Sequence, residues 1–192
     1  MIRVPPALHK PEPKETRLDL IRYCEVAERA ARRGGQILLE MAGNFSVSEK
    51  GRGDLVTSAD LASQDVIRQT LLQEFPTHTF LGEESQETPD PAEFRWIVDP
   101  LDGTSNYVHG LEFYAVSIGL EVRGVLVAGV IYQPAADKCF TATQGGGAYL
   151  GGQPIRVSQV PDLRNSLLVT GFPPGMRGRS DLLRLFEEFC AE

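Results

Sequence analysis

Carboxylates gather at the ends of two short apolar runs in the middle of the chain. Glu83 and Glu84 directly follow the first run, and Asp99 and Asp102 follow the second. Acids placed at one edge of a sheet repel one another unless a cation neutralises them. All the candidate donors are oxygen atoms, which suit Mg²⁺ or Mn²⁺ better than zinc. The pattern therefore predicts a site for a hard divalent cation.

Residues 99–103, Asp-Pro-Leu-Asp-Gly, combine two of these acids with a bend. Taken alone, this segment is also a good β-turn sequence, and so is Gly-Glu-Glu-Ser after the first run. Pro100 fixes its own φ angle and lacks an N–H, so the chain can bend while its carbonyls face inward. Asp99 and Asp102 are then expected to point at one cavity, with the Leu101 carbonyl between them.

The residues after this bend suit an anion. Gly103 has no side chain, so the amides and hydroxyls of Thr104 and Ser105 can approach a phosphate. Metal ions neutralise phosphate oxygens and amides orient them, whereas acids alone would repel phosphate. The sequence has no Gly-x-Ser-x-Gly elbow, no cysteine followed six residues later by Arg, and no Asp-x-Asp pair. Because no covalent nucleophile is visible, a metal-activated water is the predicted nucleophile.

Two helices are expected to precede the strands. Small and apolar residues recur every three or four positions over 18–42, which predicts a helix. The pair Gly34-Gly35 inside it lowers helix stability, which indicates close packing against a neighbour. A second helix is expected over 58–75, capped by Ser58 or Thr57 and ended by a proline.

Strands follow, mostly joined as hairpins, before a last helix from about Ser180. The expected strands are at 79–81, 95–98, 113–120, 125–132, 138–143, 148–150 and 167–170. Two helices followed by hairpin-linked strands predict an α/β protein of the layered α+β kind, with the helices on one face of a mixed, largely antiparallel sheet.

Composition and charge exclude other classes. The 192 residues are 42% hydrophobic and 23% charged, as in ordinary globular proteins. Residues 74–102 hold eight acids and one base, which accounts for the whole net charge of −7, so nucleic-acid binding through a basic footprint is not expected. The apolar run 124–131 is far shorter than the ~20 residues that span a bilayer. With no signal-type apolar run, a cytoplasmic protein without membrane contact is expected, and residues 1–15 are expected to form a flexible lead-in.

Three motifs in this order resemble the inositol monophosphatase family. They are Lys50 with Asp54-Leu55-Val56-Thr57-Ser58-Ala59-Asp60, Gly82-Glu83-Glu84-Ser85, and Trp96-Ile97-Val98-Asp99-Pro100-Leu101-Asp102-Gly103-Thr104-Ser105-Asn106-Tyr107. Gly147-Ala148-Tyr149 and Pro154-Ile155-Arg156-Val157-Ser158 are similar to the family as well. The resemblance runs from about the first helix to the chain end, and it implies Mg²⁺-dependent hydrolysis of a phosphate monoester with lithium inhibition.

The resemblance implies a role for each matching residue. The implied metal ligands for Mg²⁺, or Mn²⁺ in its place, are Glu83, Asp99, the Leu101 carbonyl and Asp102. Thr104, hydrogen-bonded to Asp60, would orient and deprotonate the attacking water, and Glu84 would assist a metal-bound water. The implied substrate contacts are Glu83, Leu101, Asp102, Gly103, Thr104 and Ser105, of which the last three hold the phosphate.

One family motif is missing from the sequence. The family carries a later Trp-Asp motif in a C-terminal α/β layer, whereas the single tryptophan here, Trp96, belongs to an earlier motif. Residues 16–192 are therefore expected to be the N-terminal portion of a sugar-phosphatase domain, apparently truncated, with the C-terminal α/β layer absent. The resemblance implies that the aspartate of that motif completes one metal site and touches the sugar hydroxyls, so later metal sites and substrate specificity are expected to be impaired.

Two classes of function remain open at this stage. The first is a phosphatase for inositol monophosphate or a similar small sugar or polyol phosphate, with nucleotide 3′-phosphates, fructose bisphosphate and histidinol phosphate as rival substrates. The second is a non-catalytic remnant that binds a metal or a partner without turnover. A homodimer is expected, because the missing layer would leave apolar surface exposed.

Overall fold

The computed structural model describes residues 16–51, 54–83, 92–171 and 179–190. Its helices are α1 (Arg17–Met41), α2 (Ser58–Glu74), the short α3 (Thr104–Val108) and α4 (Ser180–Cys190). No helix among these described residues combines the length and the apolar character needed to cross a bilayer. The lead-in expected over 1–15 lies outside the described residues.

A seven-stranded sheet follows the order of the chain, β3-β4-β5-β6-β7-β8-β9. Its strands are β3 (Thr79–Gly82), β4 (Phe94–Asp102), β5 (Ala115–Val122), β6 (Val125–Gln133), β7 (Lys138–Thr143), β8 (Gly147–Leu150) and β9 (Gln153–Ile155). β3 and β4 are parallel, and the other neighbouring pairs are antiparallel. A separate hairpin of β1 (Val47–Gly51) and β2 (Asp54–Thr57) connects α1 to α2. The largely antiparallel sheet predicted from the sequence is confirmed.

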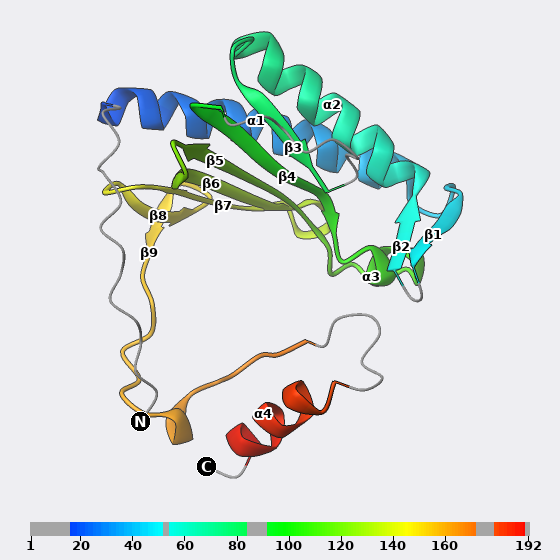
Figure 1. Ribbon diagram of the computed structural model, residues 1–192, viewed down its shortest axis with the longest axis vertical. Coiled ribbons are helices and arrows are strands. Elements are labelled where there is room, and N and C mark those ends of the chain that lie inside the picture. Colours follow the sequence, from blue (N-terminus) through cyan, green and yellow to red (C-terminus); the bar gives the residue numbers. More distant parts are fainter. Residues whose placement is uncertain (1–15, 52–53, 84–91, 172–178, 191–192) are drawn as a thin grey trace.

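Helices α1 and α2 lie side by side on one face of this sheet (Figure 1). Alternate residues of β5 point toward them, since Val116, Ile118 and Leu120 are at most 2% exposed. Burial of each such side chain stabilises the fold by roughly 1.5–3 kcal/mol. Helices and sheet therefore share one hydrophobic core, and the predicted layered α+β architecture is confirmed.

The glycine pair in α1 allows two close contacts. A Cβ atom on Gly34 would lie 2.7 Å from Ile67 Cδ1 of α2, and one on Gly35 would lie 2.6 Å from Tyr132 Cε1 of β6. α1 thus approaches the second helix with one glycine and the sheet with the other. The close packing predicted from these two glycines is confirmed.

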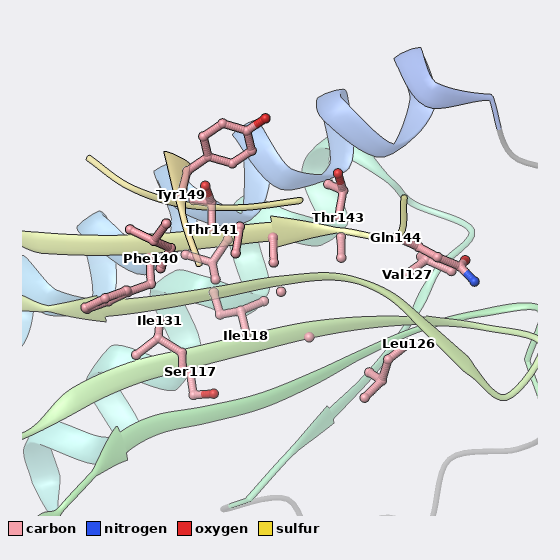
Figure 2. Close-up of a pocket in the computed structure, with 17 residues that line it drawn as sticks. Ser117, Ile118, Leu126, Val127, Ile131, Phe140, Thr141, Thr143, Gln144 and Tyr149 are labelled. Carbon is pink, nitrogen blue, oxygen red and sulfur yellow. The ribbon is translucent and has the colours of Figure 1, made fainter. Parts of the chain in front are cut away.

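The opposite face of the sheet carries a shallow apolar hollow of about 510 Å³ (Figure 2). A row of residues with small side chains or none crosses four strands and forms its floor: Gly119, Gly129, Ala142 and Ala148. Ile131 and Phe140 are paired in the neighbouring row, and Ile131 is 49% exposed. The two faces of the sheet therefore differ, because α1 and α2 cover only one of them.

Two sequence predictions about strands need correction. The strand expected over 113–120 begins at Ala115, because Phe113 belongs to the loop after α3. The strand expected over 167–170 does not form in the described part of the chain. Leu167 and Val169 are more than 90% exposed there, and a β-rich run without a neighbouring strand has no ladder to join.

The contact at Gly35 predicts a reversal of the usual effect of alanine in a helix. Gly→Ala in a helix interior normally stabilises a protein by up to about 1 kcal/mol. Gly35→Ala should instead lower the free energy of unfolding by about 1–3 kcal/mol, because the Tyr132 ring and Pro134 must move. Urea unfolding measures this, with the exposed Gln36→Ala as a control within about 0.5 kcal/mol of the parent. Stabilisation by Gly35→Ala would contradict the packing described.

Candidate active site

Glu83 and Asp99 meet at the carboxyl ends of the parallel strands β3 and β4. Gly82 pairs with Val98, and the Glu83 N–H donates to the Val98 carbonyl at 2.9 Å, so the next residues of the two strands lie side by side. The side chains of Glu83 and Asp99 are hydrogen-bonded to each other. The structure therefore brings together two of the acids that the sequence places at strand ends.

The Asp99 carboxyl keeps its proton to a higher pH than an isolated acid does. Burial first, and then the negative charge of Glu83, raises the pKa of Asp99 to about 7. The Leu101 N–H, which donates to Asp99 Oδ1 at 3.0 Å, acts in the opposite direction but does not cancel the effect. Near pH 7 the Asp99 carboxyl is therefore partly protonated, and a cation bound there would displace this proton.

A bulge in β4 brings Asp102 to the same side of the sheet as Asp99. Asp99 pairs with Ser117 and Asp102 pairs with Ala115, so β4 has one residue more than β5 between these pairs. Ser117 and Ala115 are two residues apart and share a face, and their partners therefore share it too. Without the extra residue, Asp102 would lie on the opposite face.

Helix α2 holds both strands in place beneath this pair of acids. The buried Ser63 hydroxyl donates to the Pro100 carbonyl at 3.1 Å, which anchors the bend between Asp99 and Leu101. A Cβ atom on Gly82 would lie 2.0 Å from Gln64 Oε1, so glycine at this position of β3 leaves room for the Gln64 side chain of α2. Ser63 could not be predicted as part of the site, because a serine within a helix carries no signal of a partner 37 residues away.

Gly103 turns the chain from β4 into α3. Its φ of 93° lies in the left-handed region, and a Cβ atom there would lie 3.0 Å from the Phe113 carbonyl. The short helix that follows is fixed by Tyr107, whose hydroxyl donates to the Leu38 carbonyl of α1 at 2.7 Å. In Figure 1, α3 lies beside the β1–β2 hairpin, at the point where α2 begins.

Thr104 and Asp60 form a second polar contact next to the bend. The Thr104 hydroxyl lies 3.2 Å from Asp60 Oδ1 and 3.0 Å from the Leu101 carbonyl. Asp60 is in the first turn of α2 and only 1% exposed. The contact joins residues 44 positions apart, as the resemblance implies.

The remaining predicted residues are exposed or lie outside the described part of the chain. Asp102 and Ser105 are exposed, and Glu84 lies outside the described residues. A cavity of about 350 Å³ beside the bend is lined by Asp102 and Gly103. That Asp99 and Asp102 point at one cavity stays a prediction. Within the described ranges, no three His, Cys, Asp or Glu side chains are close enough together to hold a metal ion.

The donors present nevertheless fit a hard divalent cation. Glu83 and Asp99 offer carboxyl oxygens, and the Leu101 carbonyl lies two residues after Asp99. Oxygen donors of this kind suit Mg²⁺ and Mn²⁺ rather than zinc. Asp102, on the same face of the sheet, is the further carboxylate available to complete such a site.

The raised pKa of Asp99 predicts how the stability of the metal-free protein depends on pH. The folded pKa of about 7 exceeds the ordinary value of 3.8, so the folded state binds the proton more tightly than the unfolded state. The Tm in a chelating buffer should therefore fall as the pH rises from 4 to about 8. At pH 8, Asp99→Asn should have a higher Tm than the parent protein, and its Tm should change less with pH. The exposed Asp65→Asn should show the same pH dependence of Tm as the parent. Parallel profiles for all three proteins would contradict the placement of Asp99.

Comparison with known proteins agrees with this geometry. The model of the inositol monophosphatase family matches residues 19–182. A fructose-1,6-bisphosphatase/inositol-1-monophosphatase from Aquifex aeolicus is 38% identical over 180 residues, which cover 91% of this chain and 67% of that protein. Inositol monophosphatase 3 from Solanum lycopersicum is 44% identical over 156 residues, which cover 77% of this chain and 57% of that protein.

Solved structures are similar over the same region. The extragenic suppressor protein suhB from Bartonella henselae has a TM-score of 0.82 at 40% identity, covering 88% of this chain and 66% of that one. The inositol monophosphatase from Anabaena has a TM-score of 0.72 at 37% identity, covering 83% and 58%. The chain thus spans about two thirds or less of the length of these relatives, and over that length it belongs to the inositol monophosphatase family.

Proposed function

We propose that this protein is a Mg²⁺-dependent phosphate monoester hydrolase that acts on inositol monophosphate or a similar small sugar or polyol phosphate. The observation that carries the proposal is the Thr104–Asp60 contact of 3.2 Å beside the Glu83–Asp99 carboxyl pair. A hydroxyl backed by a buried carboxylate can orient and deprotonate a water molecule. Paired carboxylates at the ends of strands can hold the cation that phosphate chemistry needs.

The proposed ligands follow the resemblance and the donor chemistry. They are Glu83, Asp99, the Leu101 carbonyl and Asp102, with Mg²⁺, or Mn²⁺ in its place. When bound, the metal neutralises the phosphate oxygens and makes water a better nucleophile. Glu84 is proposed to assist that water. Among the implied substrate contacts, the backbone amides at Gly103, Thr104 and Ser105 are proposed to orient the phosphate.

The proton of the attacking water has a path through this chain's own residues. Thr104 accepts it at Oγ1 and passes its own hydroxyl proton to Asp60 Oδ1, which lies 3.2 Å away. The water oxygen then bonds to phosphorus as the ester P–O bond breaks, and the leaving alkoxide takes a proton from solvent water to become the alcohol. Because Asp60 is almost fully buried, bulk water has little access to its carboxylate.

The proposed substrate is a class of compounds, the small sugar or polyol phosphates. Relatives named as inositol monophosphatases favour inositol monophosphate, and the bifunctional Aquifex name keeps fructose bisphosphate among the rivals. Nucleotide 3′-phosphates and histidinol phosphate are the other two rival substrates. We also propose a cytoplasmic location, from the absence of a signal-type apolar run, and a homodimer, from the apolar surface that the missing layer would leave exposed.

A binding role without turnover is the second candidate. It is favoured by a relative named Nus factor SuhB from Escherichia coli, which is 40% identical over 152 residues. A protein of this second kind would keep the fold and bind a metal or a partner, but would release no phosphate.

Phosphate release tests the proposal directly. The purified protein is incubated with each of the four substrate candidates, with Mg²⁺ or with chelator. Asp102→Asn should lower kcat by roughly 100-fold or more while Tm stays near that of the parent, because it removes a ligand charge and little volume. The exposed Glu112→Gln, on the loop after α3, serves as the matched control with unchanged turnover.

Two results would count against the proposal. Full turnover by Asp102→Asn would exclude the role given to that carboxylate. No Mg²⁺-dependent release from any of the four substrates would favour the second candidate.

A further inference from the structure

The chain contains two Thr-x-x-Asp capping boxes of nearly identical geometry. In α1, the backbone N–H and hydroxyl of Thr16 donate to Asp19 Oδ2 at 3.0 and 2.7 Å, and the Asp19 N–H returns to the hydroxyl at 3.3 Å. In α2, Thr57 and Asp60 make the same three bonds at 2.9, 2.5 and 3.3 Å. Both boxes satisfy free N–H groups at a helix start, so capping alone does not distinguish them.

What distinguishes the second box is its surroundings. Thr16 and Asp19 are exposed, whereas Thr57 and Asp60 are each 1% exposed. Asp60 also has a distant partner, because its Oδ1 faces the Thr104 hydroxyl at 3.2 Å. The same local motif therefore caps the helix in α1. In α2 it caps the helix and also contacts the proposed site.

The hydrogen bonds of the second box determine which Asp60 oxygen Thr104 meets. Oδ2 accepts from both the N–H and the hydroxyl of Thr57, which uses its two lone pairs. The Thr57 hydroxyl itself accepts from the N–H groups of Ala59 and Asp60, so its own proton points at Oδ2. Oδ1 is the oxygen left for Thr104, and the carboxylate cannot rotate without breaking these bonds.

Thr57 is itself held rigidly by the chain around it. It is the last residue of β2, where it pairs with Val47, and its side chain is β-branched. The next residue, Ser58, donates its N–H to the Ser46 carbonyl at 3.0 Å and accepts from the Ser46 N–H at 3.1 Å. The hairpin between the two helices therefore sets the position of the Thr57 hydroxyl.

We propose that Thr57 is a positioning residue that locks the Asp60 carboxylate toward Thr104 and so sets the efficiency of water activation. This inference rests on the proposed function for its kinetic consequence, but its structural consequence does not depend on turnover. Thr57 touches neither substrate nor metal in this account. Its whole effect passes through Asp60.

Three substitutions separate positioning from capping. Thr57→Val keeps the shape and removes the hydroxyl, Thr57→Ser keeps the hydroxyl, and Thr16→Val removes the matching hydroxyl of the exposed box. Crystal structures of the Thr57 variants should show Asp60 turned out of hydrogen-bond distance of Thr104 in Thr57→Val but not in Thr57→Ser. In phosphate release, Thr57→Val should lose roughly 10- to 100-fold in kcat with little change in KM. Thr57→Ser should stay within about 3-fold of the parent, and Thr16→Val should lose stability but not kcat.

If Thr57→Val does not fold, Thr57→Gly replaces it, because glycine at a helix N-cap costs only a few tenths of a kcal/mol relative to threonine. An unchanged Asp60–Thr104 contact in the hydroxyl-free variant overturns the proposal, and so does a kcat equal to that of Thr16→Val. Absence of turnover in the parent protein contradicts the proposed function instead. In that case the crystal structures still decide whether Thr57 positions Asp60.

Discussion

Glu83 and Asp99 are forced into contact by a parallel pair of strands, and their mutual repulsion governs the rest of the site. The backbone of Glu83 is fixed by its N–H, which donates to the Val98 carbonyl, and the Asp99 side chain is held by the Leu101 N–H. The fold therefore keeps two acidic groups together, and the raised pKa of Asp99 reflects this in the absence of metal. A divalent cation would relieve the same repulsion more fully, so the instability of the free site favours binding.

A single helix, α2, supports the acidic residues of the site. Helix α2 anchors the β4 bend through Ser63, leaves room for β3 at Gly82, and presents Asp60 to Thr104. Its own position depends on α1, which can approach it only because residue 34 is glycine. One helix thus holds both the proposed metal ligands and the proposed proton acceptor, which keeps their separation constant.

Much of this fold could be predicted from the sequence, because local signals agreed with the tertiary structure. Helical periodicity, the cap at Thr57 and the glycine pair correctly predicted α1, α2 and their close packing. The β4 bulge could not be predicted, since an extra residue is visible only relative to the partner strand. The predicted strand over 167–170 was wrong for a related reason, since a strand also needs a partner strand. The composition of this segment suits a strand, but no strand of the described residues pairs with it.

The site was partly predictable for the same physical reasons. Strand-end acids and a left-handed glycine are local features, and the contacts Glu83–Asp99 and Thr104–Asp60 were anticipated. Distant partners such as Ser63 have no local signature. The roles of Asp102, Ser105 and Glu84 stay predictions, because the first two are exposed and the third lies outside the described residues.

Calorimetry of Mg²⁺ binding in buffers of different ionisation enthalpy tests the central claim most directly, since it counts protons released. If a cation displaces the proton of Asp99, binding at pH 6.5 should release up to about one proton, and binding at pH 9 almost none. Asp99→Asn should bind Mg²⁺ weakly and release no proton at either pH. No binding by the parent protein, or binding at pH 6.5 without proton release, would contradict the account.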